Sequence, residues 1–233
     1  MKTNGLPRQH LILDADDTLW ENNIYFEHAF DQFCAYLAHS SMAPQQIRAV
    51  LDKIETANAK VNGYGCRSFG RNLAACFQSL AEGHISERDL EAVQEFAHAI
   101  LDRPIELLAG VEDTIAQLSL RHELTLFTKG DSEEQQFKID RSGLTRYFRH
   151  TAIAKEKNEP AYRELAQERG FPVHKTWMIG NSPKSDINPA LAAGLNAVYV
   201  PHPRTWSLEH EPVPDSHPRL LRLERITELT NYF

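Results

Sequence analysis

The chain has 233 residues, of which 42% are hydrophobic and 24% are charged, and its formal net charge is −7 at pH 7. This length and composition are typical of a globular protein with room for more than one hydrophobic core. An acidic chain disfavours a broad nucleic-acid surface, because the phosphate backbone attracts positive charge. Apolar runs stay short of the roughly 20 residues that cross a bilayer, and residues 1–5 lack the apolar segment of a signal peptide. We therefore expect a cytoplasmic protein that binds neither nucleic acid nor membrane.

The most informative segment is an apolar run, residues 11–13, that ends at two carboxylates. We expect this run to form a strand. On an extended backbone Asp14 and Asp16 point the same way, and their mutual repulsion must be relieved by a cation, a shared proton or both. Such a pair suits phosphoryl transfer, in which one carboxylate attacks phosphorus, its neighbour moves a proton and Mg²⁺ neutralises charge. An acidic turn that ends a strand is the alternative interpretation.

Residues 22–101 carry apolar side chains at helical spacing and show no strand signal. Four sets recur with this spacing: Phe26, Phe30, Phe33 and Leu37; Ile47, Val50, Leu51 and Ile54; Phe69, Leu73, Cys76 and Leu80; and Leu90, Val93, Ala97 and Ile100. The pattern predicts an α-helical bundle with a core of its own. Ser86 and Asp89 form a capping-box pattern before the last set. Because the bundle interrupts the chain directly after the acidic strand, we expect it to be a cap domain that excludes water from the site.

Residues 1–21 and 102–233 are expected to form the other domain, an α/β core. Apolar runs that predict strands stand at residues 124–127, 151–154, 177–179 and 197–200. Helical patterns stand between them, at residues 111–120, 133–142, 160–169 and 189–193. This alternation is typical of a doubly wound, Rossmann-like parallel sheet with helices on both faces. Residues 201–218 hold five prolines and are expected to run as an extended connection over the surface.

Ligands of a doubly wound sheet bind beyond the carboxyl ends of its strands, so the residues that follow each apolar run are candidates for a site. They offer carboxylates, hydroxyls, amides and ammonium groups. In chain order they are Asp14, Asp16 and Thr18; Thr128, Lys129 and Asp131; Lys155 and Lys157; and Gly180, Asn181, Ser182 and Asp186. Because the net charge repels a phosphorylated substrate at long range, attraction must come from a metal ion and from nearby lysines.

With these segments in order, the chain resembles the haloacid dehalogenase-like hydrolases, a superfamily dominated by phosphatases. Residues 14–18 (DADDT) are similar to the first motif of that family, Thr128 at a strand end to the second, and Lys157 before Pro160 to the third. Residues 180–186 (GNSPKSD) are similar to the fourth. The first and fourth matches are the more specific. The resemblance extends along the whole predicted core, with a helical insertion at the expected place.

The resemblance implies a role for each matching side chain. Asp14 would attack the phosphoryl group and form an aspartyl-phosphate. Asp16 would protonate the leaving oxygen and later activate water. Thr128 would hydrogen-bond the phosphoryl oxygens, and Lys157 would offset their charge and that of Asp14.

The resemblance also implies a Mg²⁺ site. The Asp14 carboxylate and the Asp16 backbone carbonyl would bind the ion, and the fourth motif would complete its ligands. The family more often carries Asp where this chain has Asn181. An Asn ligates through its carbonyl oxygen but adds no charge, and Asp186 is available directly or through water. Asn181 and Asp186 are therefore both candidate metal ligands.

Other residues are candidates for binding the substrate. Thr18 and Lys129 follow the first two core strands. Related enzymes with this cap type place an interhelical loop over the active site, which makes Tyr64 and Arg67 candidates as well. Residues 63–67 (GYGCR) lack the spacing of a dinucleotide-binding loop, and a plain turn between helices is the alternative reading.

The leading hypothesis is a Mg²⁺-dependent phosphatase whose partner is a small phosphorylated metabolite such as a nucleotide, a flavin nucleotide or a sugar phosphate. A 2-haloacid dehalogenase is a second hypothesis, but that chemistry needs neither a metal nor the second carboxylate, Asp16. A phosphomutase is a third. A non-catalytic protein that binds phosphorylated metabolites is a fourth, because a fold alone does not establish catalysis.

Overall fold

The computed structural model describes residues 7–37 and 41–233. The chain divides into two compact units. One comprises Met1–Glu21 together with Ile105–Phe233, and the other comprises Asn22–Pro104. The first unit is the α/β core and the second is helical.

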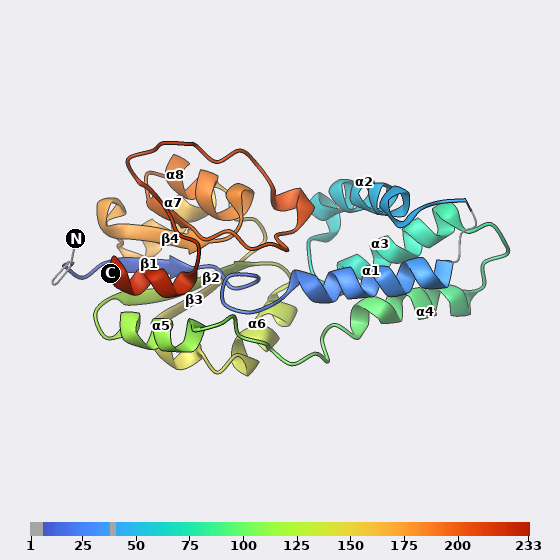
Figure 1. Ribbon diagram of the computed structural model, residues 1–233, viewed down its shortest axis with the longest axis horizontal. Coiled ribbons are helices and arrows are strands. Elements are labelled where there is room, and N and C mark those ends of the chain that lie inside the picture. Colours follow the sequence, from blue (N-terminus) through green and yellow to red (C-terminus); the bar gives the residue numbers. More distant parts are fainter. Residues whose placement is uncertain (1–6, 38–40) are drawn as a thin grey trace. The chain divides into compact units, whose positions relative to one another are not determined.

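The α/β core is built on a six-stranded parallel sheet, as the alternating pattern predicted. Its strands are β1 (His10–Leu13), β2 (Glu123–Lys129), β3 (His150–Ala154), β4 (Thr176–Gly180), β5 (Asn196–Tyr199) and β6 (Leu220–Arg222). Their order across the sheet is β3-β2-β1-β4-β5-β6, so the chain builds outward from β1 in both directions (Figure 1). β1 pairs with β2 on one side and with β4 on the other. The direction of winding therefore reverses between β1 and β4, where ligands of such sheets bind.

Helices pack on both faces of this sheet (Figure 1). They are α5 (Val111–Ser119), α6 (Ser132–Arg141), α7 (Glu159–Arg169) and α8 (Asn188–Ala192). Successive side chains of a strand point to opposite faces. Leu11 and Leu13 of β1 accordingly pack with α5 and α6, whereas Ile12 between them packs with α7 and α8. These three side chains are all fully buried.

The sequence analysis did not predict β6. This strand has only three residues and lies beyond the proline-rich segment.

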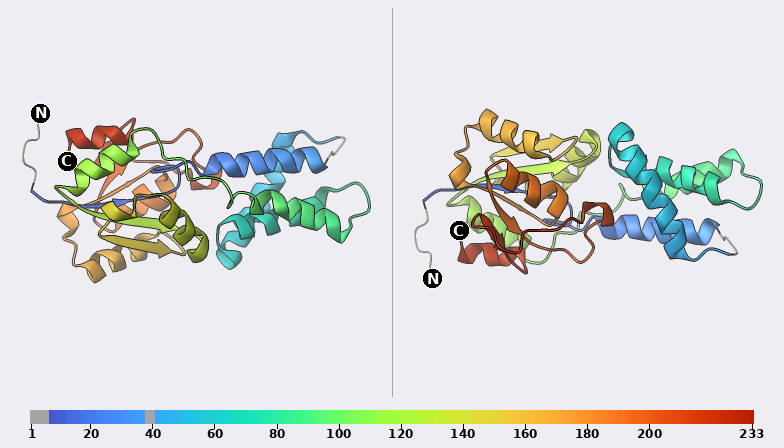
Figure 2. Two further views of the ribbon diagram at one scale, coloured as in Figure 1. Left: turned by 90° about the horizontal axis from the view of Figure 1, so that it is seen from below. Right: turned by 90° about the horizontal axis from the view of Figure 1, so that it is seen from above.

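The helical unit contains α1 (Asn23–Leu37), α2 (Pro44–Asn62), α3 (Cys66–Leu80) and α4 (Glu87–His98) (Figure 2). Each helix contributes a fully buried side chain to one shared core: Phe33, Leu51, Leu73 and Val93. The capping box is present at the start of α4, where the Ser86 side chain accepts from the Asp89 backbone and Asp89 accepts from the Ser86 backbone. In the part of the chain that the structure describes, no helix is both long and apolar enough to cross a membrane.

Candidate active site

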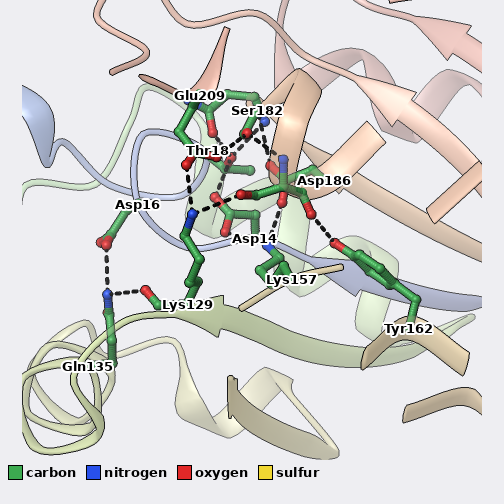
Figure 3. Close-up of polar contacts among 12 residues, drawn as sticks. Asp14, Asp16, Thr18, Lys129, Gln135, Lys157, Tyr162, Ser182, Asp186 and Glu209 are labelled. Atoms are coloured by element: carbon green, nitrogen blue, oxygen red, sulfur yellow. Dashed lines mark hydrogen bonds and ion pairs between the residues drawn. The ribbon is translucent and has the colours of Figure 1, made fainter. Parts of the chain in front are cut away.

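The predicted site residues of the α/β core lie at or just after the ends of β1, β2, β3 and β4. Figure 3 shows several of them close together. Asp14 comes directly after β1, and its backbone N–H donates to the Ile179 carbonyl of β4 at 2.9 Å. Thr128 is the second-last residue of β2 and is 1% exposed. This arrangement follows from the parallel sheet, which brings all strand carboxyl ends to one edge.

Two carboxylates of the site share one buried ammonium group. Nζ of Lys157 lies 2.8 Å from Oδ1 of Asp14 and also contacts Oδ1 of Asp186. The side chains of Lys157 and Asp186 are each 1% exposed. Burial lowers the pKa of Lys157, but the two carboxylates outweigh this effect and the pKa lies above its usual value. Burial, together with the Asp14 carboxylate, raises the pKa of Asp186 to about 7.

The turn after β4 places Asp186. This residue belongs to a π-helical turn, Pro183–Ile187. The Ser182 backbone N–H donates to Oδ2 of Asp186 at 2.9 Å. A Cβ atom at Gly180 would overlap the Asp186 carboxylate, so the last position of β4 has to be glycine. From α7, the Tyr162 hydroxyl donates to the Ser185 carbonyl at 2.8 Å and holds the turn in place.

Thr18 links the first and fourth motifs. Its Oγ1 lies 3.0 Å from Oδ2 of Asp14 and 3.1 Å from Oδ1 of Asn181. The Asn181 side chain also donates from Nδ2 to Oγ1 of Thr205 at 2.8 Å, and the Thr205 hydroxyl donates onward to the His202 carbonyl. An Asp at position 181 would lack the donor that this chain of hydrogen bonds uses. The structure thereby gives a physical reason for the amide where the family more often has a carboxylate.

Asp16 is turned toward helix α6 and away from the shared ammonium group (Figure 3). Its Oδ1 accepts from Nε1 of Trp20 at 2.8 Å, and its Oδ2 accepts from Nε2 of Gln135 at 2.9 Å. Nζ of Lys138 lies 2.6 Å from both oxygens. Sequence reasoning missed Gln135 and Lys138. Their spacing of three residues, which puts both on one face of the helix after the second motif, was the available signal.

Lys129 forms a buried ion pair. Its Nζ lies 2.6 Å from Oε1 of Glu209 and 2.9 Å from Oγ of Ser185. The other oxygen of Glu209 accepts from the Ser182 hydroxyl at 2.6 Å. Burial pushes the pKa of Glu209 upward, but the Lys129 ammonium and the serine hydroxyls outweigh burial and hold this pKa below its usual value. The expected part of Lys129 in binding substrate stays a prediction.

The proline-rich segment contributes to the site, although we expected only a surface connection. Thr205 and Glu209 are 9% and 8% exposed and both contact the fourth motif. No local pattern in the sequence marked either of them. The remaining candidates, Tyr64 and Arg67, belong to the helical unit, where Tyr64 precedes α3 and Arg67 lies in its first turn. Their part in binding substrate also stays a prediction.

The oxygen atoms of the site suit a hard divalent cation. Asp14 and Asp186 present carboxylate oxygens on either side of the Lys157 ammonium, and Asn181 adds a carbonyl oxygen nearby. Carboxylate and amide oxygens are the ligands that Mg²⁺ prefers. Separately, one ligand atom from each of Asp17, Glu21 and His202 lies within 4.8 Å of the other two.

The chain belongs to the haloacid dehalogenase-like hydrolases, because the model of that family matches residues 9–194. A haloacid dehalogenase-like family hydrolase from Xanthomonas campestris has a similar structure, with a TM-score of 0.81 and 30% sequence identity over 96% of this chain and 93% of that chain. The Bacillus subtilis protein YfnB bound to magnesium has a TM-score of 0.65 and 18% identity, over 97% and 99% of the two chains. L-2-haloacid dehalogenase from Xanthobacter autotrophicus, with chloropropionic acid covalently bound, has a TM-score of 0.64 and 14% identity, over 95% and 96%. No curated protein matches the chain.

The predicted family is confirmed, and the protein is a hydrolase with a Rossmann-like core. Members of this superfamily typically use a divalent metal, and acidic side chains cluster in this chain accordingly. Family membership alone does not choose between phosphate esters and halogenated acids as substrates, because both activities share the fold.

Proposed function

We propose that the protein is a Mg²⁺-dependent phosphatase that hydrolyses small phosphate monoesters through an aspartyl-phosphate on Asp14. One observation carries this proposal. Asp14 and Asp186 share the buried ammonium of Lys157, and a second carboxylate, Asp16, follows Asp14 by two residues on the same strand end. Phosphoryl transfer needs a nucleophile, a proton carrier and charge neutralisation, and this group of side chains supplies all three.

The first step forms an ester between Asp14 and the phosphoryl group. A carboxylate oxygen of Asp14 attacks phosphorus, the bond from phosphorus to the ester oxygen breaks, and Asp16 gives a proton to that oxygen. In the second step Asp16 takes a proton from water, the water oxygen attacks phosphorus, the bond from phosphorus to the Asp14 oxygen breaks, and inorganic phosphate is released. Lys157 offsets negative charge throughout, and the Thr128 hydroxyl hydrogen-bonds the phosphoryl oxygens.

Four residues would hold Mg²⁺: Asp14 by its carboxylate, Asp16 by its backbone carbonyl, and Asn181 and Asp186 by their side chains. When bound, the ion neutralises charge on Asp14 and on the phosphoryl oxygens. The carboxylate oxygens of Asp14 and Asp186, which gather around Lys157, support such a cation. The magnesium bound to the Bacillus subtilis relative is consistent with it.

The helical unit Asn22–Pro104 would serve as the cap that selects the substrate. The four groups that handle the phosphoryl group are the same for any ester, so discrimination has to come from contacts with the rest of the molecule. Tyr64 and Arg67 are the proposed contacts. A guanidinium offers a fork of donors to a second phosphate, a carboxylate or a base of the substrate.

A second candidate activity is release of halide from a 2-haloacid, which a structurally similar dehalogenase favours. Both activities would use Asp14 as nucleophile, toward phosphorus in one case and toward carbon in the other. Only the phosphatase uses Asp16 as a proton carrier. The presence of this second carboxylate supports the phosphatase.

The test is a substrate panel. The purified protein is incubated with nucleotide, flavin nucleotide and sugar phosphates, and separately with 2-chloropropionate, in each case with Mg²⁺ or with EDTA. We expect release of inorganic phosphate that requires Mg²⁺ and no release of chloride. Metal-independent chloride release would contradict the proposal. Transfer of the phosphoryl group to a second sugar position would identify a phosphomutase instead, and binding without turnover would identify a sensor.

A further inference from the structure

Both oxygens of the Asp16 carboxylate are held by side chains. Oδ1 accepts from the Trp20 indole and Oδ2 accepts from the Gln135 amide, while Nζ of Lys138 lies 2.6 Å from each oxygen. Within residues 7–37 and 41–233, no hydrogen bond joins the Asp16 carboxylate to Asp14. The carboxylate that has to move protons is therefore fixed by side chains outside the Asp14 group.

The other ammonium groups of the site already have carboxylate partners. Lys157 contacts Asp14 and Asp186, and Lys129 pairs with Glu209. A mobile Asp16 would compete for these cations and would disturb the charge around the nucleophile. Lys138 supplies a separate counter-charge on the far side of Asp16.

Helix α6 is built so that Lys138 reaches this position. Asp131 caps the helix by accepting the backbone N–H groups of Glu133 and Glu134, at 3.1 Å each. Gly130 has a φ of +149°, and a Cβ there would come within 2.8 Å of Nε2 of Gln135. The absence of a side chain lets Gln135 donate both to Asp16 and to the Lys129 carbonyl. Gly130 and Asp131 therefore set where α6 begins, and this start places the side chains of Gln135 and Lys138 against Asp16.

We propose that Lys138 is a positioning residue of the hydrolysis, acting through Asp16. The inference rests on the proposed phosphatase function and adds a residue to it. Lys138 holds the ionised Asp16 carboxylate by both oxygens. When Asp16 carries a proton, one oxygen bears it and the other keeps its hydrogen bond to the ammonium, so the side chain stays in place. The leaving-group oxygen then meets a proton donor in a fixed place.

The consequence is a dependence on the leaving group. Esters of simple alcohols need their leaving oxygen protonated, whereas p-nitrophenolate leaves without a proton. Lys138→Met keeps the length of the side chain and removes its donors. We expect this variant to lower kcat on an alkyl or sugar phosphate by about tenfold or more, and kcat on p-nitrophenyl phosphate by less than about threefold, with KM little changed on both.

The experiment compares wild type, Lys138→Met, Lys138→Arg and Gln136→Ala on these two esters. Gln136 is exposed on the same helix and its side chain donates to Asp140, so its variant controls for changes in α6. Lys138→Arg keeps a donor beside Asp16 and should recover part of the loss on the alkyl ester. An equal loss on both esters, or no loss, would overturn the positioning role. If wild type hydrolyses neither ester, the proposed function fails first and this inference fails with it.

Discussion

Oε1 of Glu209 lies 2.6 Å from Nζ of Lys129, although the two residues are 80 positions apart in the chain. Both side chains are about nine-tenths buried. Glu209 also accepts from the Ser182 hydroxyl. This carboxylate therefore ties the proline-rich segment to the end of β2 and to the turn after β4, and the site depends on a residue far from its sequence motifs.

Glu209→Gln should destabilise the α/β core at pH 7. The substitution leaves the Lys129 ammonium buried without its carboxylate partner, and breaking such a pair costs about 3 kcal/mol or more. The three tryptophans, at positions 20, 177 and 206, all belong to this unit, so urea unfolding followed by tryptophan fluorescence reports on it. Glu211→Gln, two residues away and exposed, is the matched control. Equal unfolding free energies for the two variants would contradict the role of the pair.

The same comparison has a defined pH dependence. The folded protein holds the pKa of Glu209 below its usual value of 4.5. A carboxyl group with a lowered folded-state pKa stabilises the fold above its unfolded-state pKa, and this contribution is lost as pH falls through the folded-state pKa. The difference in unfolding free energy between wild type and Glu209→Gln should be largest near pH 7 and shrink below about pH 4. A difference that is constant over this range would show that the charge of Glu209 is not its cause.

Glu55 in helix α2 behaves in the opposite way. Its side chain is 7% exposed, and its Oε2 has no hydrogen-bond partner among the described residues. Burial raises the pKa of Glu55 from 4.5 to about 7, although the Arg48 guanidinium opposes the shift. Stability from a raised carboxyl pKa is fully present below the unfolded-state value and is lost as pH rises through the folded-state value. The ionised Glu55 therefore costs the helical unit on the order of 3 kcal/mol above pH 7.

Glu55→Gln should consequently raise the unfolding free energy of the helical unit by about 1 to 3 kcal/mol at pH 8 and leave it nearly unchanged at pH 4. Because the helical unit contains no tryptophan, its unfolding free energy is measured by far-ultraviolet circular dichroism during urea unfolding. Glu91→Gln on the exposed face of α4 is the control and should change little at either pH. An equal gain in unfolding free energy at pH 4 and at pH 8 would show that the buried charge of Glu55 is not the cause.

Arg67→Ala tests the proposed selection of substrate by the helical unit. We expect the ratio of kcat/KM between the best natural ester and p-nitrophenyl phosphate to fall by about tenfold, since only the larger ester has groups for the guanidinium to contact. Arg88→Ala, an exposed arginine on α4, should leave this ratio unchanged. A loss by one common factor on both esters would assign Arg67 to the phosphoryl group or to the stability of the unit.

Local patterns in the sequence were enough to predict the layered core and the motif residues. The apolar run before Asp14 and the alternation of strands and helices after residue 102 define a parallel sheet, and such a sheet brings strand ends together. This is why Asp14, Lys157 and Asp186 were expected in one place before their distances were known.

Contacts between distant segments could not be predicted in this way. Glu209 and Thr205 lie among prolines with no periodicity, and their partners are 24 or more positions away. Lys138 looks like an ordinary polar helix residue in the sequence, and only the packing of α6 on the sheet turns it toward Asp16, 122 positions earlier. The orientation of these side chains depends on tertiary packing, which local sequence patterns do not specify.

Asp14→Asn is the most direct test of the central claim, because it removes the nucleophile and nearly preserves the shape of the side chain. Phosphate release in the presence of Mg²⁺ is measured for wild type, for this variant and for Asp140→Asn, an exposed aspartate of α6. We predict a loss of at least about a thousandfold for Asp14→Asn and no change for the control, with both variants folded as judged by circular dichroism. Retention of more than about a tenth of the wild-type rate by folded Asp14→Asn would contradict the aspartyl-phosphate mechanism.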